Sequence, residues 1–232
     1  MTSSAGHAPA KGGALTSDGS ALGPRHALVR ETVMSFALRR CRAPSVVELV
    51  DAIGISGTTE EDVRKTLSEL QDAHAVVLHP GGELYMAHPF AFYPTLFQVS
   101  FTQHDGPIPK RGCFDSPCIW CALGAAAALE NAGLGDSCIT TCDGGDCSRP
   151  VQLNIRSGSI EPTKSAEGGD EWLVHFLVPA RNAWENVAYT CSNMLLFSSR
   201  RRIEEWRERN GVKPGEGDIK TLKQTADMAR GW

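Results

Sequence analysis

Residues 117–129 read PCIWCALGAAAAL and place two cysteines and a tryptophan at the start of a short apolar helix. Alanine and leucine are strong helix formers, and Gly133 stands where the helix should stop, since glycine is the usual residue just past a helix end. Cys121 should therefore lie in or near the first helical turn, where free backbone N–H groups and the helix dipole favour a thiolate over a thiol. We predict that Cys191, in a second apolar run, meets Cys121 in the fold and shares its chemistry.

Length and charge limit the class of protein. The chain has 232 residues, enough for one large domain or two small ones, and a formal net charge of −4. That charge gives no reason to expect a nucleic acid or an anionic membrane as partner. The N-terminus shows no signal peptide, and the apolar stretch 116–129 is too short to span a bilayer as a helix. We therefore expect a soluble, cytoplasmic protein whose thiols stay reduced.

The chain has eight cysteines, and seven of them lie between residues 113 and 191. In a reducing compartment, such clustering points to metal binding or catalysis rather than to disulfides. One alternative is a structural zinc site, for which Cys118-x-x-Cys121 would supply half of the ligands. The other half would have to come from cysteines that lack the tight partner spacing of zinc ligands, namely Cys138, Cys142 and Cys147.

Three further interpretations of the cysteines remain open. A thioredoxin-like redox pair would need a βαβ context, which is missing before Cys118. Cysteines can also be buried small hydrophobes, as we expect for Cys41. The last interpretation is a soft-metal thiolate site with Cys121 and Cys191 as principal ligands, because thiolate is the ligand class that soft ions such as mercury prefer. His175 stands alone in an apolar strand and is expected to be a core residue.

The N-terminal part of the chain predicts a small helical unit. Residues 1–24 are rich in Gly, Ala and Ser and are expected to be a disordered tail. A capping box completed by Glu61 marks a helix that begins at Thr58 or Thr59. Three helices followed by a hairpin is the order of a winged helix-turn-helix, which we place at 25–95. The predicted elements are helices at 25–40, 46–53 and 60–73, and a hairpin of strands at 75–78 and 83–87.

The third of these helices argues against DNA binding. A winged helix often binds DNA through its third helix, which should then be basic to lie against phosphates. Here that helix has five acidic residues and only two basic ones, Arg64 and Lys65. We therefore expect a structural or lid role for this unit and no nucleic-acid partner.

The rest of the chain alternates short strands with helices and predicts an α+β fold with a mixed sheet at 96–232. Residues 88–94 should form an aromatic linker and residues 104–112 a loop. The run 190–197 fits either a strand or a buried helix turn. The other predicted elements are strands at 96–101, 138–142, 151–155 and 172–178, a strand starting at Ile160, and helices at 199–209 and 219–228.

Several of these stretches resemble the organomercurial (alkylmercury) lyase family. The resemblance covers roughly residues 119–211 in matching order and approximate spacing, and the helical unit before it is similar in architecture. The residues that carry it are Trp120-Cys121-Ala122-Leu123, Cys142, residues 150–153 and 177–179, residues 186–199 with Cys191, and Trp206.

The resemblance implies roles for particular residues. Cys121 and Cys191 take the positions of the two cysteines that bind mercury and cleave the carbon–mercury bond, and Cys142 takes that of a structural cysteine. The family's catalytic aspartate falls on Gly124, so another group must supply the proton. Ser192 stands where some members have a further cysteine. The candidate proton donors nearest to cysteines in sequence are Asp115, Asp143, Asp146 and Cys118.

The resemblance thus implies a lyase that cleaves carbon–mercury bonds by protonolysis and releases Hg(II) and a hydrocarbon. We expect no required cofactor, with Hg(II) arising from the substrate. The expected partners are a small organometallic substrate, small cytosolic thiols and a mercuric reductase that takes the product. Two alternatives are a diverged enzyme that uses Cys121 and Cys191 on another substrate, and a non-enzymatic soft-metal binder or metal-responsive regulator.

Overall fold

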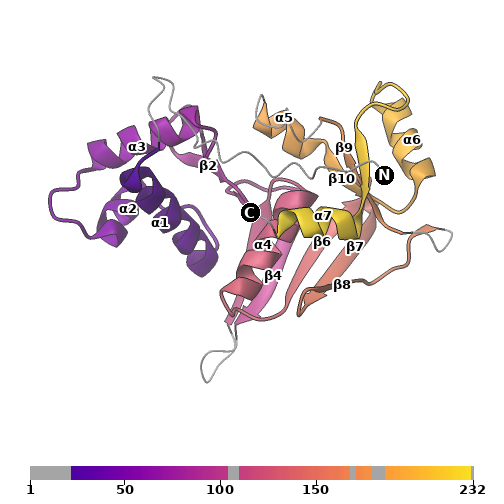
Figure 1. Ribbon diagram of the computed structural model, residues 1–232, viewed down its shortest axis with the longest axis horizontal. Helices are drawn as coiled ribbons and strands as arrows, with labels where there is room; N and C mark the ends of the chain where they lie inside the picture. The colour runs from indigo at the N-terminus through magenta and orange to yellow at the C-terminus, as the bar shows by residue number, and fades with distance from the viewer. Residues whose placement is uncertain (1–21, 104–109, 168–170, 179–185, 231–232) are drawn as a thin grey trace, which may run out of the picture.

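The computed structural model describes residues 22–103, 110–167, 171–178 and 186–230. Three helices stand at the N-terminal end, and antiparallel sheet and further helices make up the rest (Figure 1). The α+β class predicted from the sequence is therefore confirmed. None of the helices in these described ranges combines the length and the apolarity that crossing a bilayer requires. Most of the predicted tail, residues 1–21, lies outside them.

The N-terminal helices begin where a proline or a capping residue favours a helix start. The first has Pro24 at its first position, so the last residue of the predicted tail is helical. The third is capped by Thr59, whose side chain and backbone exchange hydrogen bonds with Asp62. We predicted Glu61 as the acidic partner, but the start at Thr59 makes Asp62 the third helical residue. The helices are α1 (Pro24–Arg40), α2 (Val46–Ile53) and α3 (Glu60–Asp72).

The three helices and the hairpin that follows share a buried cluster of their own, which includes Leu49 and Leu67. The strands β1 (Val77–Leu78) and β2 (Leu84–Ala87) pair antiparallel and confirm the predicted hairpin. The order of these elements agrees with a winged helix. That identity, and a domain boundary at residue 95, stay predictions.

The central sheet continues from this hairpin through the rest of the chain. Its further strands are β3 (Phe90–Ala91), β4 (Phe97–Gln103), β5 (Lys110–Ser116), β6 (Ser137–Asp143), β7 (Asp146–Arg156) and β8 (Ser159–Pro162). In the described part of the chain it has eight strands, in the order β1-β2-β3-β5-β4-β6-β7-β8. Every pairing is antiparallel, so the prediction of a mixed sheet was wrong in this respect.

Two predicted connections turn out to contain strands. Residues 88–94 include β3, which pairs with β2 on one side and β5 on the other, because the flanking prolines do not occupy the paired positions. Residues 110–112, predicted as part of a loop, belong to β5 and pair with β4. The remaining residues of that predicted loop, 104–109, lie outside the described ranges.

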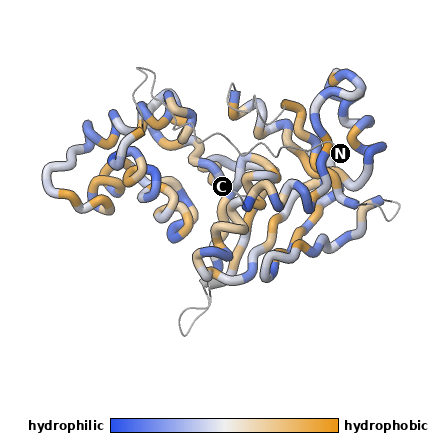
Figure 2. Tube along the Cα trace, viewed as in Figure 1, coloured by the Kyte–Doolittle hydropathy of each residue, from blue (hydrophilic) through white to orange (hydrophobic). Residues whose placement is uncertain are grey.

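The apolar helix predicted from residues 117–129 is α4 (Ile119–Asn131). It lies against β4, β5 and β6, and α7 (Leu222–Ala229) runs beside it (Figure 1). Figure 2 shows its largely apolar character, which suits a helix that is buried on most sides. Gly133, just past its end, has a φ of 67° and so adopts the left-handed conformation expected of a helix stop.

A second, three-stranded antiparallel sheet lies beyond α4. Its strands are β9 (Leu173–Phe176), β10 (Met194–Phe197) and β11 (Asp218–Thr221), in the order β10-β9-β11, with α5 (Val187–Ser192) and α6 (Arg200–Arg209) between them in sequence. The run 190–197 combines both predicted possibilities, a helix end followed by a strand. The predicted helix 219–228 begins later than expected, because residues 218–221 pair with β9 as β11.

His175 of β9 is a core residue, as predicted. Its ring packs edge-on against Trp206 with the ring centroids 5.4 Å apart, and its Nε2 lies 3.0 Å from the backbone oxygen of Glu216. It takes no part in the cysteine chemistry described below.

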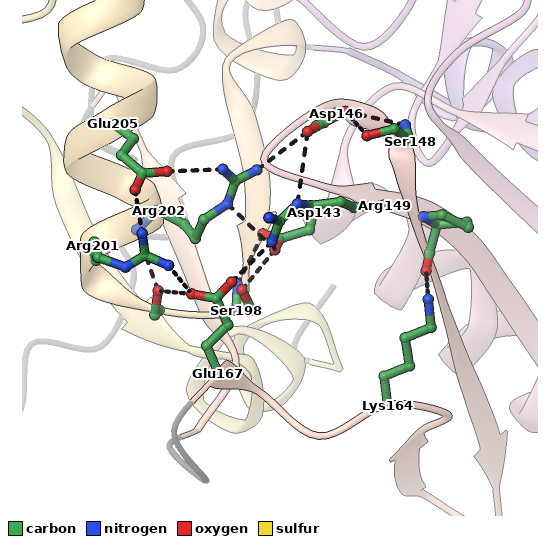
Figure 3. A network of polar contacts seen from close by, with 12 residues as sticks. Asp143, Asp146, Ser148, Arg149, Lys164, Glu167, Ser198, Arg201, Arg202 and Glu205 are labelled. Atoms are coloured by element: carbon green, nitrogen blue, oxygen red, sulfur yellow. Dashed lines mark hydrogen bonds and ion pairs between the residues drawn. The ribbon is translucent and has the colours of Figure 1, made fainter.

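A buried polar network ties the turn between β6 and β7 to the start of α6 (Figure 3). Asp143 accepts hydrogen bonds from the backbone N–H of Ser198 at 3.0 Å and from its hydroxyl at 2.6 Å. Arg202, whose side chain is only 8% exposed, forms ion pairs with Asp143 at 3.6 Å and with Asp146 at 3.5 Å. The network fixes the end of β10 against β6, and with it the position of α5 directly before β10.

We predict that Asp143→Ala lowers the free energy of unfolding by roughly 3 kcal/mol, because it removes a partner from the buried Arg202 and Ser198 groups. Urea denaturation followed by circular dichroism measures the change. Asp136→Asn is the matched control, since its ion pair with Arg156 is exposed and such pairs contribute little. Equal shifts of the urea midpoint in the two variants would contradict this role of Asp143.

Candidate functional site

The N-terminus of α4 carries two buried cysteines one helical turn apart. Cys118 is the N-cap residue, with extended backbone angles, and its Sγ accepts the backbone N–H of Cys121 at 3.4 Å. Cys118 and Cys121 are 0% and 1% exposed, respectively. The predicted position of Cys121 in the first helical turn is therefore confirmed.

A third cysteine reaches this point from the far end of the chain. Cys191 lies in the last turn of α5, which Asn186 caps by accepting the backbone N–H of Tyr189 at 3.0 Å. The side chain of Cys191 is buried and exchanges hydrogen bonds with Cys118 and Cys121. The structure thus brings Cys121 and Cys191 together, as the sequence predicted, and adds Cys118 to them. We refer to these three residues as the thiol cluster.

His88, which the sequence placed in a linker, also reaches the thiol cluster. It lies between β2 and β3, it is buried, and its Nδ1 is 3.3 Å from the Sγ of Cys121. The ligand atoms of His88, Cys121 and Cys191 all lie within 4.8 Å of one another, close enough for one ion to contact all three. No sequence signal pointed to His88, because its position depends on the pairing of β3 with strands distant in sequence.

Hydrogen bonds within the thiol cluster separate the pKa values of its members. Burial alone would raise the pKa of Cys118, but hydrogen bonds from the Cys121 and Cys191 thiols and from the Cys121 N–H hold it well below its usual range. Burial, and then the hydrogen bond to Cys118, raise the pKa of Cys121. The hydrogen bond to Cys118 raises the pKa of Cys191 as well. The thiolate predicted at Cys121 is thus favoured at Cys118, because the cap residue receives the donors.

An aromatic side chain lies close to the thiol cluster. Burial raises the pKa of Tyr93, and so do the neighbouring Tyr85 and the three cysteines. The rings of Tyr93 and Tyr85 stack with their centroids 4.1 Å apart. The three cysteines are themselves buried, and interactions between charges are stronger there than in water.

The acidic residues considered as proton donors are engaged elsewhere. Asp115 accepts the backbone N–H of Thr95 at 3.0 Å, and Asp143 and Asp146 belong to the network with Arg202. In the described ranges, no carboxylate belongs to the ligand group around Cys121. Gly124 is buried on α4, three residues after Cys121, where it offers no side chain to the site.

The remaining cysteines do not complete a zinc site. Cys142 is half-buried at the end of β6 and hydrogen-bonds to the exposed Cys147 across the turn, and burial together with this contact raises the pKa of Cys142 to about 11. Cys138 lies on the same face of β6 as Cys142. None of the three belongs to the metal-ligand group of the described residues, which disfavours the structural zinc alternative.

The described part of the chain also has a cavity that lies away from these sulfurs. It has a volume of about 580 Å³ and lies between β8 and α7, with Ile160, Trp172 and Arg230 in its wall. Neither His88 nor any cysteine of the thiol cluster lines it. The chemistry of the site therefore comes from the buried thiol cluster rather than from this cavity.

Comparison with known proteins agrees with this geometry. Residues 102–232 match the family model described as alkylmercury lyase. Among solved structures, the chain is similar to one described as the mercury-bound form of MerB2, with a TM-score of 0.64 and 20% identity over 90% of this chain and 89% of that chain. At this identity the likeness shows a shared fold. A search of curated proteins finds no significant match.

We predict that His88 contributes to the pH dependence of stability. Burial lowers the pKa of His88, so the folded protein keeps it neutral while the unfolded chain takes up a proton below about pH 6.5. Stability should therefore fall as the pH drops through this value, and His88→Gln should flatten the fall between about pH 6.5 and 5. Urea midpoints measured across this pH range give the slope of stability against pH.

The control for this measurement is His79→Gln, because His79 is exposed and its replacement should leave the slope unchanged. The buried His175 remains in all three proteins and contributes equally to each. A His88→Gln protein with the same slope as the wild type would count against the prediction.

Proposed function

This chain belongs to the alkylmercury lyase family, and from that premise we propose that it cleaves carbon–mercury bonds with Cys121 and Cys191 as mercury ligands. The observation that carries the proposal is the convergence of Cys121, Cys191 and His88 at one buried point. Thiolate sulfur is the ligand that a soft ion such as Hg(II) prefers, and both cysteines reach that point from separate helices.

The reaction we propose needs no redox step. A small thiol carries the organomercurial to the site as R–Hg–SR′, and two protein thiols exchange with it. The electron pair of the carbon–mercury bond becomes a carbon–hydrogen bond when one thiol proton moves to carbon. The other thiol proton leaves with R′SH, and Hg(II) remains on two cysteine sulfurs. A resident cofactor is not needed for this balance.

His88 is positioned to accept or donate one of these protons. Its Nδ1 lies 3.3 Å from the Sγ of Cys121, so it can receive the proton of that thiol or return it. Burial lowers the pKa of His88 and favours the neutral ring, which can both accept and donate. The dry surroundings strengthen the attraction between the metal and the sulfurs.

The product and its surroundings suggest partners. Hg(II) held by two sulfurs leaves only when other thiols compete for it, so we propose small cytosolic thiols as acceptors and a mercuric reductase as a later consumer. All eight cysteines are free thiols, in keeping with the predicted cytoplasmic location.

Two alternatives use the same cysteines differently. A diverged enzyme would apply them to a substrate without mercury, and a regulator would bind a soft metal and then DNA. The first turn of α3 is acidic, with Glu60, Glu61 and Asp62, and this disfavours contact with phosphates. Release of hydrocarbon from an organomercurial separates the lyase from both alternatives, and a DNA shift assay tests the regulator.

We predict that Cys121→Ser and Cys191→Ser each reduce hydrocarbon release at least about a hundredfold, because each removes a mercury ligand and a thiol proton. Headspace analysis with an excess of a small thiol measures the release, and titration with Hg(II) measures the site. Cys147→Ser is the control, because Cys147 is exposed and lies outside the thiol cluster. Full mercury affinity and full turnover in both serine variants would refute the assignment.

We also predict that Gly124→Asp increases hydrocarbon release. Residues three apart share a helix face, so the new carboxyl group would lie beside Cys121, and burial would keep it protonated. A positioned general acid contributes about a hundredfold or more. Gly124→Asn is the matched control, because the amide has a similar shape and no acidic proton. If the Asp and Asn variants keep the mercury site and release hydrocarbon equally, a missing carboxylate does not limit this protein.

A further inference from the structure

We infer that Cys118 is a third sulfur ligand for mercury and compensates for the carboxylate that is missing at Gly124. The inference rests on the proposed function for the identity of the substrate. It concerns a residue to which the resemblance assigns no role. The contacts of Cys118, its place on α4 and its effect on the electron density of mercury each support it.

The contacts of Cys118 go beyond those of a buried hydrophobe. Its Sγ receives the backbone N–H of Cys121 at 3.4 Å and is fully enclosed. The thiols of Cys121 and Cys191 both form hydrogen bonds with it, so its sulfur adjoins the point where the ligand atoms of His88, Cys121 and Cys191 meet. Cys118 lies outside the group whose ligand atoms are all within 4.8 Å of one another, so mercury would have to lie on the Cys118 side of Cys121 and Cys191 to contact all three sulfurs.

Helix capping alone does not explain a cysteine at this position. Serine, threonine, aspartate and asparagine are the preferred N-cap residues, because oxygen accepts the free N–H groups better than sulfur does. The other helices of the described residues that have a side-chain cap follow that preference, with Ser45, Thr59, Asn186, Ser199 and Thr221. Cys118 thus caps the helix less well than an oxygen-bearing side chain would. In exchange, its sulfur places a soft metal ligand at the start of the helix.

The place of Cys118 on the helix complements that of Gly124. Cys118 stands one turn before Cys121 and Gly124 stands one turn after it, so each of the two positions is a neighbour of Cys121 on the helix, on opposite sides of it. On the Gly124 side the site has no functional group. On the Cys118 side it has an additional sulfur, which lies at the positive end of the helix dipole, where negative charge is favoured.

A third sulfur changes the electron density on mercury and leaves the balance of protons as it was. R–Hg–SR′ reacts with two protein thiols to give RH, R′SH and Hg(II) bound by two sulfurs, so both thiol protons are used. Cys118 adds to mercury as a thiolate and so brings no further proton, and the product is Hg(II) bound by three sulfurs with one negative charge. The metal then carries more electron density from sulfur before the carbon–mercury bond breaks. The electron pair of that bond then leaves mercury for the proton more readily, which compensates for the absent carboxylic acid.

The test counts sulfur atoms around mercury, with one equivalent of Hg(II) and a small competing thiol, by X-ray absorption spectroscopy. We expect three sulfurs in the wild-type protein and two in Cys118→Ser. Serine is a preferred N-cap residue, so this variant keeps the helix start and removes only the sulfur. Cys147→Ser, which removes an exposed cysteine outside the thiol cluster, should keep three.

Measuring the lyase activity of these variants provides a second test. Hydrocarbon release should fall at least about tenfold in Cys118→Ser, which is the lower end of the cost of losing a group that supports a metal. Cys118→Asp, which restores a carboxyl group at another preferred N-cap, should still show two sulfurs. Circular dichroism confirms that each variant is folded.

The outcomes separate this inference from the proposed function. Three sulfurs in a wild-type protein that releases no hydrocarbon would support the inference and refute the lyase. Hydrocarbon release with the same sulfur count and the same rate in wild type and Cys118→Ser would support the lyase and overturn the inference. A wild-type site with only two sulfurs overturns it as well.

Discussion

The hydrogen bonds that Cys118, Cys121 and Cys191 share at the start of α4 are the interaction that the rest of the structure has to hold in place. Three sulfurs can share protons this way only if the elements that carry them are held within hydrogen-bond distance and away from water. The sulfurs of Cys118 and Cys121 come from one helix turn, so bringing them together costs little conformational entropy. Cys191 lies far along the chain, and its position depends on β10, on the second sheet and on the polar network around Asp143.

This arrangement explains why the site could be predicted in part. The α4 helix and its end at Gly133 follow from local composition, so the sequence was sufficient to place Cys121. The meeting with Cys191 was predicted through the resemblance and an apolar run, since neither residue contains information about the other. The capped helices were also predictable, with small shifts where two neighbouring residues could serve as cap, as at Thr59.

The features that were missed depend on contacts between residues that are distant in sequence, mostly through strand pairing. The two residues of β3 show no strand pattern, and only hydrogen bonds to β2 and β5 make them a strand. His88 reaches Cys121 because of that strand. The start of β11 was read as helix because its apolar spacing suits both structures, and pairing with β9 decides between them. The low pKa of Cys118 needed the positions of two other thiols, one of them from α5.

The pairing of β3 with β5 has a consequence for how such proteins can be recombined. The N-terminal helices have their own buried cluster and look like a module that evolution or an engineer could exchange. The same segment, however, ends in the strand that carries His88 to the sulfurs and is hydrogen-bonded into the sheet beneath α4. A chimera joined after residue 95 would therefore inherit its histidine from one parent and its cysteines from the other, and the match between them would decide whether the graft retains a complete set of ligands.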